Sequence, residues 1–225
     1  MVELKSKNKQ EKNVVNALEK IKKIKVVPVI VINDENNSEK LAQSLINGGL
    51  PVAEIAFRTP SAAKSIERMK AYSPDILVGA GTVINEEQAE RAIAAGADFI
   101  VSPGLSESVA DYCKQNKVLY IPGCVTPYEI MKAIECGAKV IKFFPAGAFG
   151  GLKTIKSLAA PFGSVEFMPT GGVNEDNLAE YLSFDKIAAC GGSWMAESKL
   201  IDNNKFDEIE SKCRAAAEIA AKVRA

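Results

Sequence analysis

Three charged side chains interrupt segments of the chain that are otherwise apolar. Segment 52–59 carries Glu54 and Arg58, and segment 139–145 carries Lys142. A strand has a period of two residues, so Glu54 and Arg58 share one face if 52–59 is a strand. Lysine is rarely buried without a partner, and apolar surroundings favour its neutral, nucleophilic amine. The pattern indicates a lysine nucleophile beside a carboxylate and a guanidinium, with a purely structural ion pair as the alternative.

Two glycine pairs stand where an apolar segment gives way to a helical pattern. They are Gly171-Gly172, which follows Thr170, and Gly191-Gly192, which precedes Ser193. Glycine lets the backbone approach an anion closely, and the N–H groups of such turns often bind phosphate. A lone Gly-Gly is more often only a turn, but two at corresponding places predict a phosphate site.

Three further apolar segments end in hydroxyl or turn residues. Thr82 ends the segment Val78-Gly-Ala-Gly-Thr82 and offers a hydroxyl there. Ser102-Pro103-Gly104 and Pro122-Gly123 contain Pro-Gly pairs, which are typical of turns, and we assign them to chain shape. Cys124 directly follows the second pair and is the one cysteine considered as a nucleophile, because the others fit small core residues.

The composition excludes several kinds of chemistry. The chain has no histidine, so it contains no Ser-His-Asp triad, no Cys-His pair and no His-ligated metal. Lys plus Arg number 28 and Asp plus Glu number 28, without the basic excess of a nucleic-acid-binding protein. We therefore expect no His-ligated metal and no nucleic-acid partner, and we also predict no other metal and no cofactor.

The sequence also predicts a cytoplasmic location. No apolar stretch approaches the roughly 18 residues that span a bilayer, so no membrane partner is expected. The lysine-rich start lacks the apolar core of a signal peptide. Five cysteines without a C-x-x-C pair indicate free thiols in a reducing compartment; they are Cys113, Cys124, Cys136, Cys190 and Cys213.

The apolar segments recur with the spacing of strand–helix units. Each is followed by a helical pattern, and the eight start near Val26, Val52, Ile76, Asp98, Val118, Lys139, Val165 and Lys186. Three of the helices end at glycine, which tolerates the left-handed conformation there: Gly48-Gly49, Gly96 and Gly137. Ser38 is expected to cap the helix that runs to Asn47.

Eight such units predict an α/β fold, a single (β/α)8 TIM barrel over residues 1–225. Residues 1–24 would form a tail and an extra helix, with Val14, Leu18 and Ile21 on one face. The strands would fall within 26–192, and a C-terminal helix would run to 225. An open doubly wound sheet is the alternative, but it would want a G-x-G-x-x-G after the first strand, where residues 33–37 have none.

Taken together, the motifs resemble those of the 2-keto-3-deoxy-6-phosphogluconate / 4-hydroxy-2-oxoglutarate aldolases. The matching motifs run in order from about Val26 to about Trp194. They are Glu54-x-x-x-Arg58-Thr59, Gly79-Ala-Gly-Thr82, Ser102-Pro-Gly104, Lys142-Phe-Phe-Pro145, Thr170-Gly-Gly172 and Gly191-Gly-Ser-Trp194. The resemblance implies a class I, Schiff-base aldolase on a (β/α)8 fold. It also implies 2-keto acid and aldehyde substrates and a homotrimer.

The resemblance assigns a role to each matching residue. Lys142 would be the Schiff-base lysine and Glu54 the general acid and base, while Arg58 and Thr82 would hold the substrate carboxylate. The phosphate would be held by Thr170, Gly171, Gly172, Gly191, Gly192 and Ser193, and the pocket wall would include Pro103 and Phe144. Ala56 and Gly147 differ from the family pattern, in which threonine and an acidic residue are common.

Three other functions fit parts of the same pattern. One is a 2-keto-3-deoxy-6-phosphogalactonate aldolase, which the sequence distinguishes poorly because the two substrates are epimers that differ at one carbon. Another phosphate-binding barrel enzyme, an isomerase or epimerase, would share the glycine pairs but would not need Lys142. A non-catalytic sensor of sugar-acid phosphates would need neither Glu54 nor Lys142.

Overall fold

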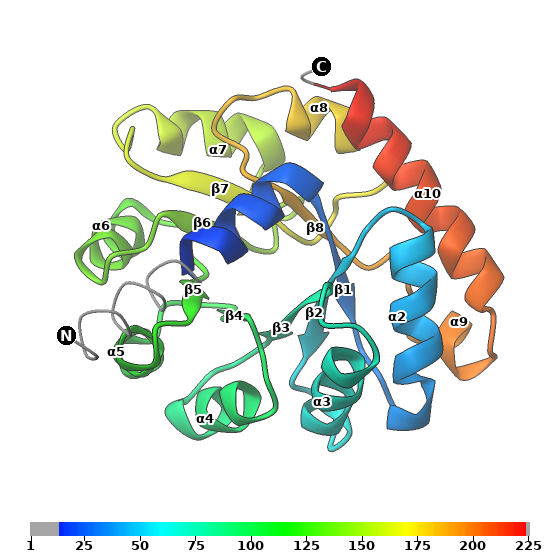
Figure 1. The fold of residues 1–225 in the computed structure, drawn as a ribbon. Helices are drawn as coiled ribbons and strands as arrows, with labels where there is room; N and C mark the ends of the chain where they lie inside the picture. Colours follow the sequence, from blue (N-terminus) through cyan, green and yellow to red (C-terminus); the bar gives the residue numbers. More distant parts are fainter. Residues whose placement is uncertain (1–13, 224–225) are drawn as a thin grey trace.

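A computed structural model describes residues 14–223, in which strands and helices alternate (Figure 1). Residues 14–24 are helical. The strands are β1 (Val26–Ile30), β2 (Val52–Ala56), β3 (Leu77–Gly81), β4 (Phe99–Val101), β5 (Leu119–Ile121), β6 (Val140–Phe143), β7 (Glu166–Pro169) and β8 (Cys190–Gly192). The remaining helices are the short 3₁₀ helix η1 (Glu35–Asn37), α2 (Ser38–Asn47), α3 (Ala62–Tyr72), α4 (Glu86–Ala94), α5 (Glu107–Asn116), α6 (Pro127–Glu135), α7 (Gly151–Ala159), α8 (Leu178–Leu182), α9 (Ser198–Asp202) and α10 (Phe206–Lys222).

The strands pair in parallel and the sheet curls, with helices outside it (Figure 1). Six strands run in the order β5-β4-β3-β2-β1-β8, and β6 pairs with β7. Single parallel bridges lie between these two sheets, at Gly123–Lys142, Phe167–Ile187 and Thr170–Gly191. The predicted parallel α/β fold is confirmed, but its ladders form a six-stranded and a two-stranded sheet, not one continuous ladder of eight.

The last strand begins later than the sequence predicted. We expected it near Lys186, but β8 starts at Cys190, which is in register with Val26 of β1. Ile187 makes only one bridge, to Phe167 of β7. The predicted strand is therefore divided between two neighbours: Ile187 bridges to β7, and only residues 190–192 form a ladder, with β1.

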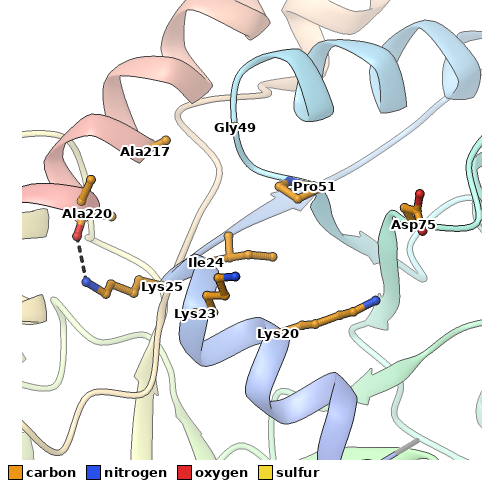
Figure 2. A pocket seen from close by; sticks show the side chains of 10 residues that line it. Lys20, Lys23, Ile24, Lys25, Gly49, Pro51, Asp75, Ala217 and Ala220 are labelled. Carbon is orange, nitrogen blue, oxygen red and sulfur yellow. Dashed lines mark hydrogen bonds between the residues drawn. The ribbon is translucent and has the colours of Figure 1, made fainter.

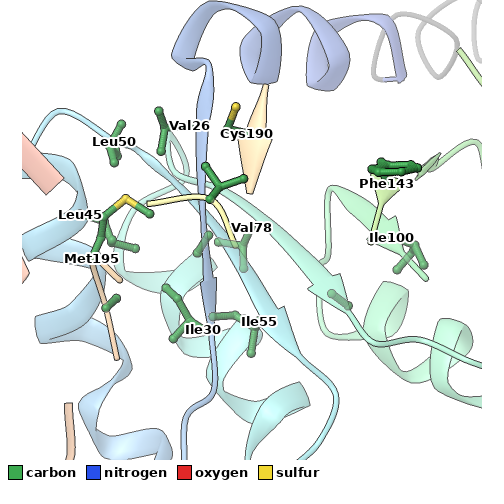
Figure 3. Packing of buried hydrophobic residues seen from close by; sticks show 14 of the residues in the cluster. Val26, Ile30, Leu45, Leu50, Ile55, Val78, Ile100, Phe143, Cys190 and Met195 are labelled. Atoms are coloured by element: carbon green, nitrogen blue, oxygen red, sulfur yellow. The ribbon is translucent and has the colours of Figure 1, made fainter. Parts of the chain in front are cut away.

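Alternate strand residues contribute to two apolar clusters, as expected for strands buried on both faces. One cluster lies between the strands and the outer helices and includes Ile30, Ile55, Val78, Ile100 and Phe143 (Figure 3). The other contains no residue of α2–α10, which places it inside the curl; it includes Val27, Val52, Leu77, Phe99, Val140, Ala17 and Ile21. The helix over 14–24 thus packs across the first residues of the strands, and the predicted face of Val14, Leu18 and Ile21 is confirmed.

The predicted glycine stops at three helix ends are also confirmed. Gly49, Gly96 and Gly137 have φ of 79°, 93° and 90° after α2, α4 and α6. In each case the next N–H donates to the carbonyl five residues earlier, as Ala138 does to Ala133 at 2.9 Å. This is the Schellman arrangement, and it turns each chain end into the following strand.

The predicted helix cap at Ser38 is wrong. Asp34 accepts a hydrogen bond from the N–H of Asn36 and caps the 3₁₀ turn Glu35–Asn37, so the helical segment begins earlier. Ser38 is the first residue of α2 and is fully buried. Asp34 and Ser38 are both typical capping residues, and the sequence alone did not show which of the two begins the helical segment.

Replacing Gly137 by alanine is expected to lower the free energy of unfolding by about 1–2 kcal/mol, because an L-residue is strained in the left-handed region. A Cβ there would meet no atom within 4 Å, so the backbone alone causes the loss. Gly163→Ala is the matched control: its added Cβ also meets nothing, and its φ lies outside the left-handed region. Urea unfolding compares the two, and equal stabilities would contradict the assignment of strain to Gly137.

Among residues 14–223, no helix is long and apolar enough to cross a membrane.

Candidate active site

The structure brings Glu54 of β2 and Lys142 of β6 together, although 88 residues separate them. Lys142 Nζ donates a hydrogen bond to Glu54 Oε1 at 3.0 Å. Lys142 is 5% exposed and Glu54 is 0% exposed, and Lys142 Nζ lies 5.3 Å from the centre of the Phe144 ring. Because strands have a period of two, Val140 inside the curl places Lys142 on the same inner face. A buried amine and carboxylate in direct contact can exchange one proton without any change in net charge.

One oxygen of Glu54 is left for another partner. Oε2 is buried and has no hydrogen-bond partner in the part of the chain that the structure describes. On the other side, a Cβ at Gly81 would overlap Oε1 and would lie 2.7 Å from the Glu54 Cγ. A glycine in the neighbouring strand β3 thus provides the space in which the carboxylate lies. A buried carboxylate oxygen without a partner is costly in a purely structural ion pair and is expected of a group that meets a substrate or a water.

The Arg58 and Thr82 side chains meet just beyond the C-terminal ends of β2 and β3. β2 ends at Ala56, so Arg58 lies in the turn beyond the strand and is exposed, not on the strand face that the period of two predicted. Its Nε donates to Thr82 Oγ1 at 3.1 Å. Within residues 14–223, its two terminal nitrogens make no hydrogen bond or ion pair, so a planar pair of donors remains for a carboxylate.

The two glycine loops also lie side by side. Thr170 is 5% exposed and forms a bridge with Gly191, where a Cβ would overlap the Thr170 hydroxyl. Gly171 and Gly172 have φ of 82° and 86°, a conformation that favours glycine whether or not an anion binds. The Gly147 N–H donates to Gly171 O at 2.8 Å and ties this loop to the end of β6.

The remaining predicted loop residues, Gly192 and Ser193, lie at the end of β8 and in the turn after it. A Cβ at Gly192 would overlap the indole ring of Trp194, which lies over this glycine. Ser193 is exposed in the turn that follows β8, and its hydroxyl makes no hydrogen bond to other described residues. The sequence missed Asn177, whose side chain donates to Gly172 O at 2.9 Å and accepts from the Asn174 N–H.

Comparison with known proteins identifies the family. An aldolase family model described as "KDPG and KHG aldolase" matches residues 17–212. The chain belongs to this aldolase family.

Individual relatives of the aldolase family cover most of the chain. The 2-dehydro-3-deoxy-phosphogluconate aldolase of Haemophilus influenzae is 43% identical over 192 residues, which are 85% of this chain and 91% of that protein. The KHG/KDPG aldolase of Escherichia coli is 37% identical over 192 residues, which are 85% and 90% of the two chains. A crystal structure of KDPG aldolase from Legionella pneumophila, with pyruvate captured at low pH as a covalent carbinolamine intermediate, has a TM-score of 0.85 at 37% identity and covers 89% of this chain and 97% of that chain.

In this aldolase-family chain, Phe144 lies close to both Lys142 and Gly171. It is half-buried beside Lys142, and a Cβ at Gly171 would lie 3.2 Å from its ring. Pro103 is farther from the ion pair: it lies against Gly123, which is the bridge partner of Lys142. Gly81 connects the ion pair to the Arg58–Thr82 pair, because it lies against Glu54 and directly precedes Thr82 in the sequence.

Two residues outside the main site differ in what the structure adds to their sequence patterns. Ser102, which precedes a Pro-Gly pair, is 1% exposed and donates to the Val83 carbonyl at 2.6 Å. Cys124 is 2% exposed, and burial raises the pKa of its thiol to about 12. Such a thiol stays protonated at neutral pH and is a poor nucleophile.

A separate pocket of about 400 Å³ lies at the opposite end of this aldolase-family fold (Figure 2). Lys25, Pro51 and Asp75 line it, and these residues precede β1, β2 and β3. The Lys25 ammonium donates to Ala220 O at 3.0 Å and to Val223 O at 2.6 Å, so it caps the end of α10. The pocket holds none of the predicted site residues, and chemistry in α/β barrels belongs to the other end of the strands. Among residues 14–223, no three Cys, Asp or Glu side chains cluster as metal ligands.

Proposed function

We propose that this chain is a class I aldolase, a carbon–carbon lyase that forms a Schiff base on Lys142. It cleaves 2-keto-3-deoxy-6-phosphogluconate reversibly to pyruvate and glyceraldehyde 3-phosphate. It also cleaves 4-hydroxy-2-oxoglutarate to pyruvate and glyoxylate, in keeping with the names of its relatives in Haemophilus influenzae and Escherichia coli. The buried contact between Lys142 Nζ and Glu54 Oε1, with Oε2 unpartnered, carries the proposal.

The ion pair supplies both groups that the reaction needs. Transfer of a proton from Nζ to Glu54 gives a neutral amine, whose lone pair attacks the C2 ketone of the substrate. Glu54 then returns protons so that the carbinolamine loses water and becomes an iminium. General acid–base help of this kind contributes about 10²–10⁴-fold to the rate.

The iminium acts as an electron sink for carbon–carbon cleavage. Glu54 accepts the proton of the C4 hydroxyl, the C3–C4 electron pair moves toward the iminium nitrogen, and the aldehyde leaves. The remaining enamine is protonated at C3, and water hydrolyses the resulting iminium to pyruvate and the free lysine. No metal or organic cofactor takes part in these steps.

The other site residues bind the two ends of the substrate. Arg58 and Thr82 hold the carboxylate, since a guanidinium fork suits its two oxygens. The phosphate binds to Thr170, Ser193 and the backbone N–H groups at Gly171-Gly172 and Gly191-Gly192. Phe144 and Pro103 form the wall between these ends.

We further propose that residues 1–225 form one closed (β/α)8 barrel domain in a cytoplasmic homotrimer. The three bridges at Gly123–Lys142, Phe167–Ile187 and Thr170–Gly191 support closure. A protein cage designed by fusing symmetric oligomeric domains has a TM-score of 0.81 at 26% identity, which supports an oligomer. The five cysteines, all within the described residues, form no disulfide, in agreement with a reducing compartment.

The alternatives fit the geometry less well. A structure of native KDPGal aligns with a TM-score of 0.80 but at 26% identity, below the 37–43% of the gluconate-named relatives. An isomerase or a sensor would not need a buried lysine in contact with a carboxylate that has a free oxygen. These alternatives are therefore secondary.

Borohydride reduction in the presence of pyruvate tests the proposal. We expect one pyruvate-derived group per chain, mapped by mass spectrometry to Lys142, and turnover of both the phosphorylated and the unphosphorylated 2-keto acid. Comparing kcat/KM for the gluconate and galactonate substrates separates the epimers. Active enzyme without an adduct would overturn the Schiff-base reaction, and a preference for the galactonate would replace the substrate.

A further inference from the structure

Thr82 has a backbone conformation that a β-branched residue rarely adopts. Its φ is 59°, in the left-handed region, whereas the other non-glycine residues with positive φ in the described range are lysine or asparagine. For a β-branched side chain such a conformation is a true outlier, and it persists only where the surroundings hold it. Because the Thr82 hydroxyl accepts from Arg58 Nε at 3.1 Å, the strain lies at the proposed carboxylate site.

The backbone on both sides of Thr82 is held by hydrogen bonds. The Phe57 N–H donates to Gly81 O at 2.7 Å, and the Val83 N–H donates to Val101 O at 3.2 Å. These two bonds join the C-terminal ends of neighbouring strands, β2 to β3 and β3 to β4. One residue beyond Thr82, the Val83 carbonyl accepts a hydrogen bond from the Ser102 hydroxyl at 2.6 Å. Ser102 therefore fixes, through its side chain, the peptide that follows Val83, one residue beyond Thr82.

Two partners hold the Ser102 hydroxyl. Its single proton goes to Val83 O, and the side chain also shares a hydrogen bond with Tyr120. Tyr120 in turn accepts from the Ser106 N–H at 3.2 Å. Burial raises the pKa of Tyr120 to about 12, so the phenol keeps its proton at neutral pH. Chains of this kind strengthen each member through polarisation.

We propose that Ser102 is a positioning residue, which holds Thr82 in its left-handed conformation so that Thr82 and Arg58 together bind the carboxylate of the 2-keto acid. Tyr120 supports it by orienting the Ser102 hydroxyl. This inference rests on the proposed aldolase function and assigns a role to Ser102, which the proposed function leaves without one. Ser102 itself touches neither the reacting carbons nor Lys142.

Kinetics in the synthetic direction test the inference, because pyruvate carries the carboxylate and glyceraldehyde 3-phosphate does not. In Ser102→Ala we expect the KM for pyruvate to rise about 5- to 30-fold, the loss of one or two hydrogen-bond contributions. The KM for the aldehyde and kcat should stay within about threefold, since a binding contact and not the chemistry is disturbed. Tyr120→Phe should shift the pyruvate KM in the same direction by a smaller factor, and it keeps the test open if Ser102→Ala does not fold.

The matched control is Ser65→Ala in α3. Ser65 is also fully buried, and its hydroxyl has no hydrogen-bond partner in the described range, so neither KM should change. An unchanged pyruvate KM in Ser102→Ala, or an equal rise for both substrates, would overturn the positioning role. Failure of the proposed function has a different signature: the wild-type protein would form no borohydride-trapped pyruvate adduct.

Discussion

Lys142→Met is expected to lose both the borohydride-trapped pyruvate adduct and all measurable turnover. Methionine fills a similar volume but has no amine, so no iminium can form. Removal of the ammonium also leaves Glu54 as an unpaired buried charge, which typically costs about 3–5 kcal/mol of stability. Urea unfolding and mass spectrometry on the same preparation measure both effects, and an adduct on another residue of active Lys142→Met would contradict the assignment.

Two companion variants separate the lost nucleophile from the lost ion pair. Lys142→Arg keeps a positive charge beside Glu54, but a guanidinium stays protonated and cannot attack a ketone. It should be more stable than Lys142→Met and equally inactive. The double variant Lys142→Met/Glu54→Gln removes the uncompensated charge, so it should recover part of the stability and none of the activity.

Local sequence patterns predicted much of the fold because their physical cause is local. Gly49, Gly96 and Gly137 stop helices because their φ is positive, and this requirement can be seen in the sequence alone. Apolar runs predicted the starts of the first seven strands to within one residue. Cys190 escaped this reasoning, because the start of β8 depends on pairing with Val26, far away in the sequence.

The candidate site shows the same division between local and long-range causes. Lys142 stood out because a lysine inside an apolar strand needs a partner, and Glu54 was named as that partner. The position of Arg58 was not predictable from periodicity, because β2 ends at Ala56 and the turn re-aims the side chain. The role of Ser102 was missed because a buried serine bound to the Val83 carbonyl has the same sequence as a plain Ser-Pro-Gly turn.

Glu54→Gln is expected to lower kcat by about 10²–10⁴-fold with little change in KM. The amide oxygen can still accept a hydrogen bond from Lys142 Nζ, so the shape of the site is kept while the base is lost. Pyruvate should still bind, and the trapped adduct should form slowly. Near-normal turnover would mean that Glu54 is only the ion-pair partner of Lys142.

Gly81→Ala reaches the same carboxylate without changing its chemistry. Its added Cβ would overlap Glu54 Oε1 and lie 2.7 Å from Cγ, so the side chain has to move. Misplacement of a reacting group by about 1 Å can cost about 10²-fold in rate, and we expect a kcat loss of that order. Gly163→Ala, where the added Cβ meets nothing, should leave kcat unchanged.

The double variant Glu54→Gln/Gly81→Ala decides whether the glycine acts through the carboxylate. If Gly81 only provides space for Glu54, alanine at this position has no base left to displace once glutamine stands at position 54. The double variant should then be about as slow as Glu54→Gln alone, because changes in one unit are not additive. Multiplied losses would instead mean that alanine distorts β3 and the Thr82 turn that follows it. In that case the pyruvate KM would rise together with the fall in kcat, since Thr82 lies directly after Gly81.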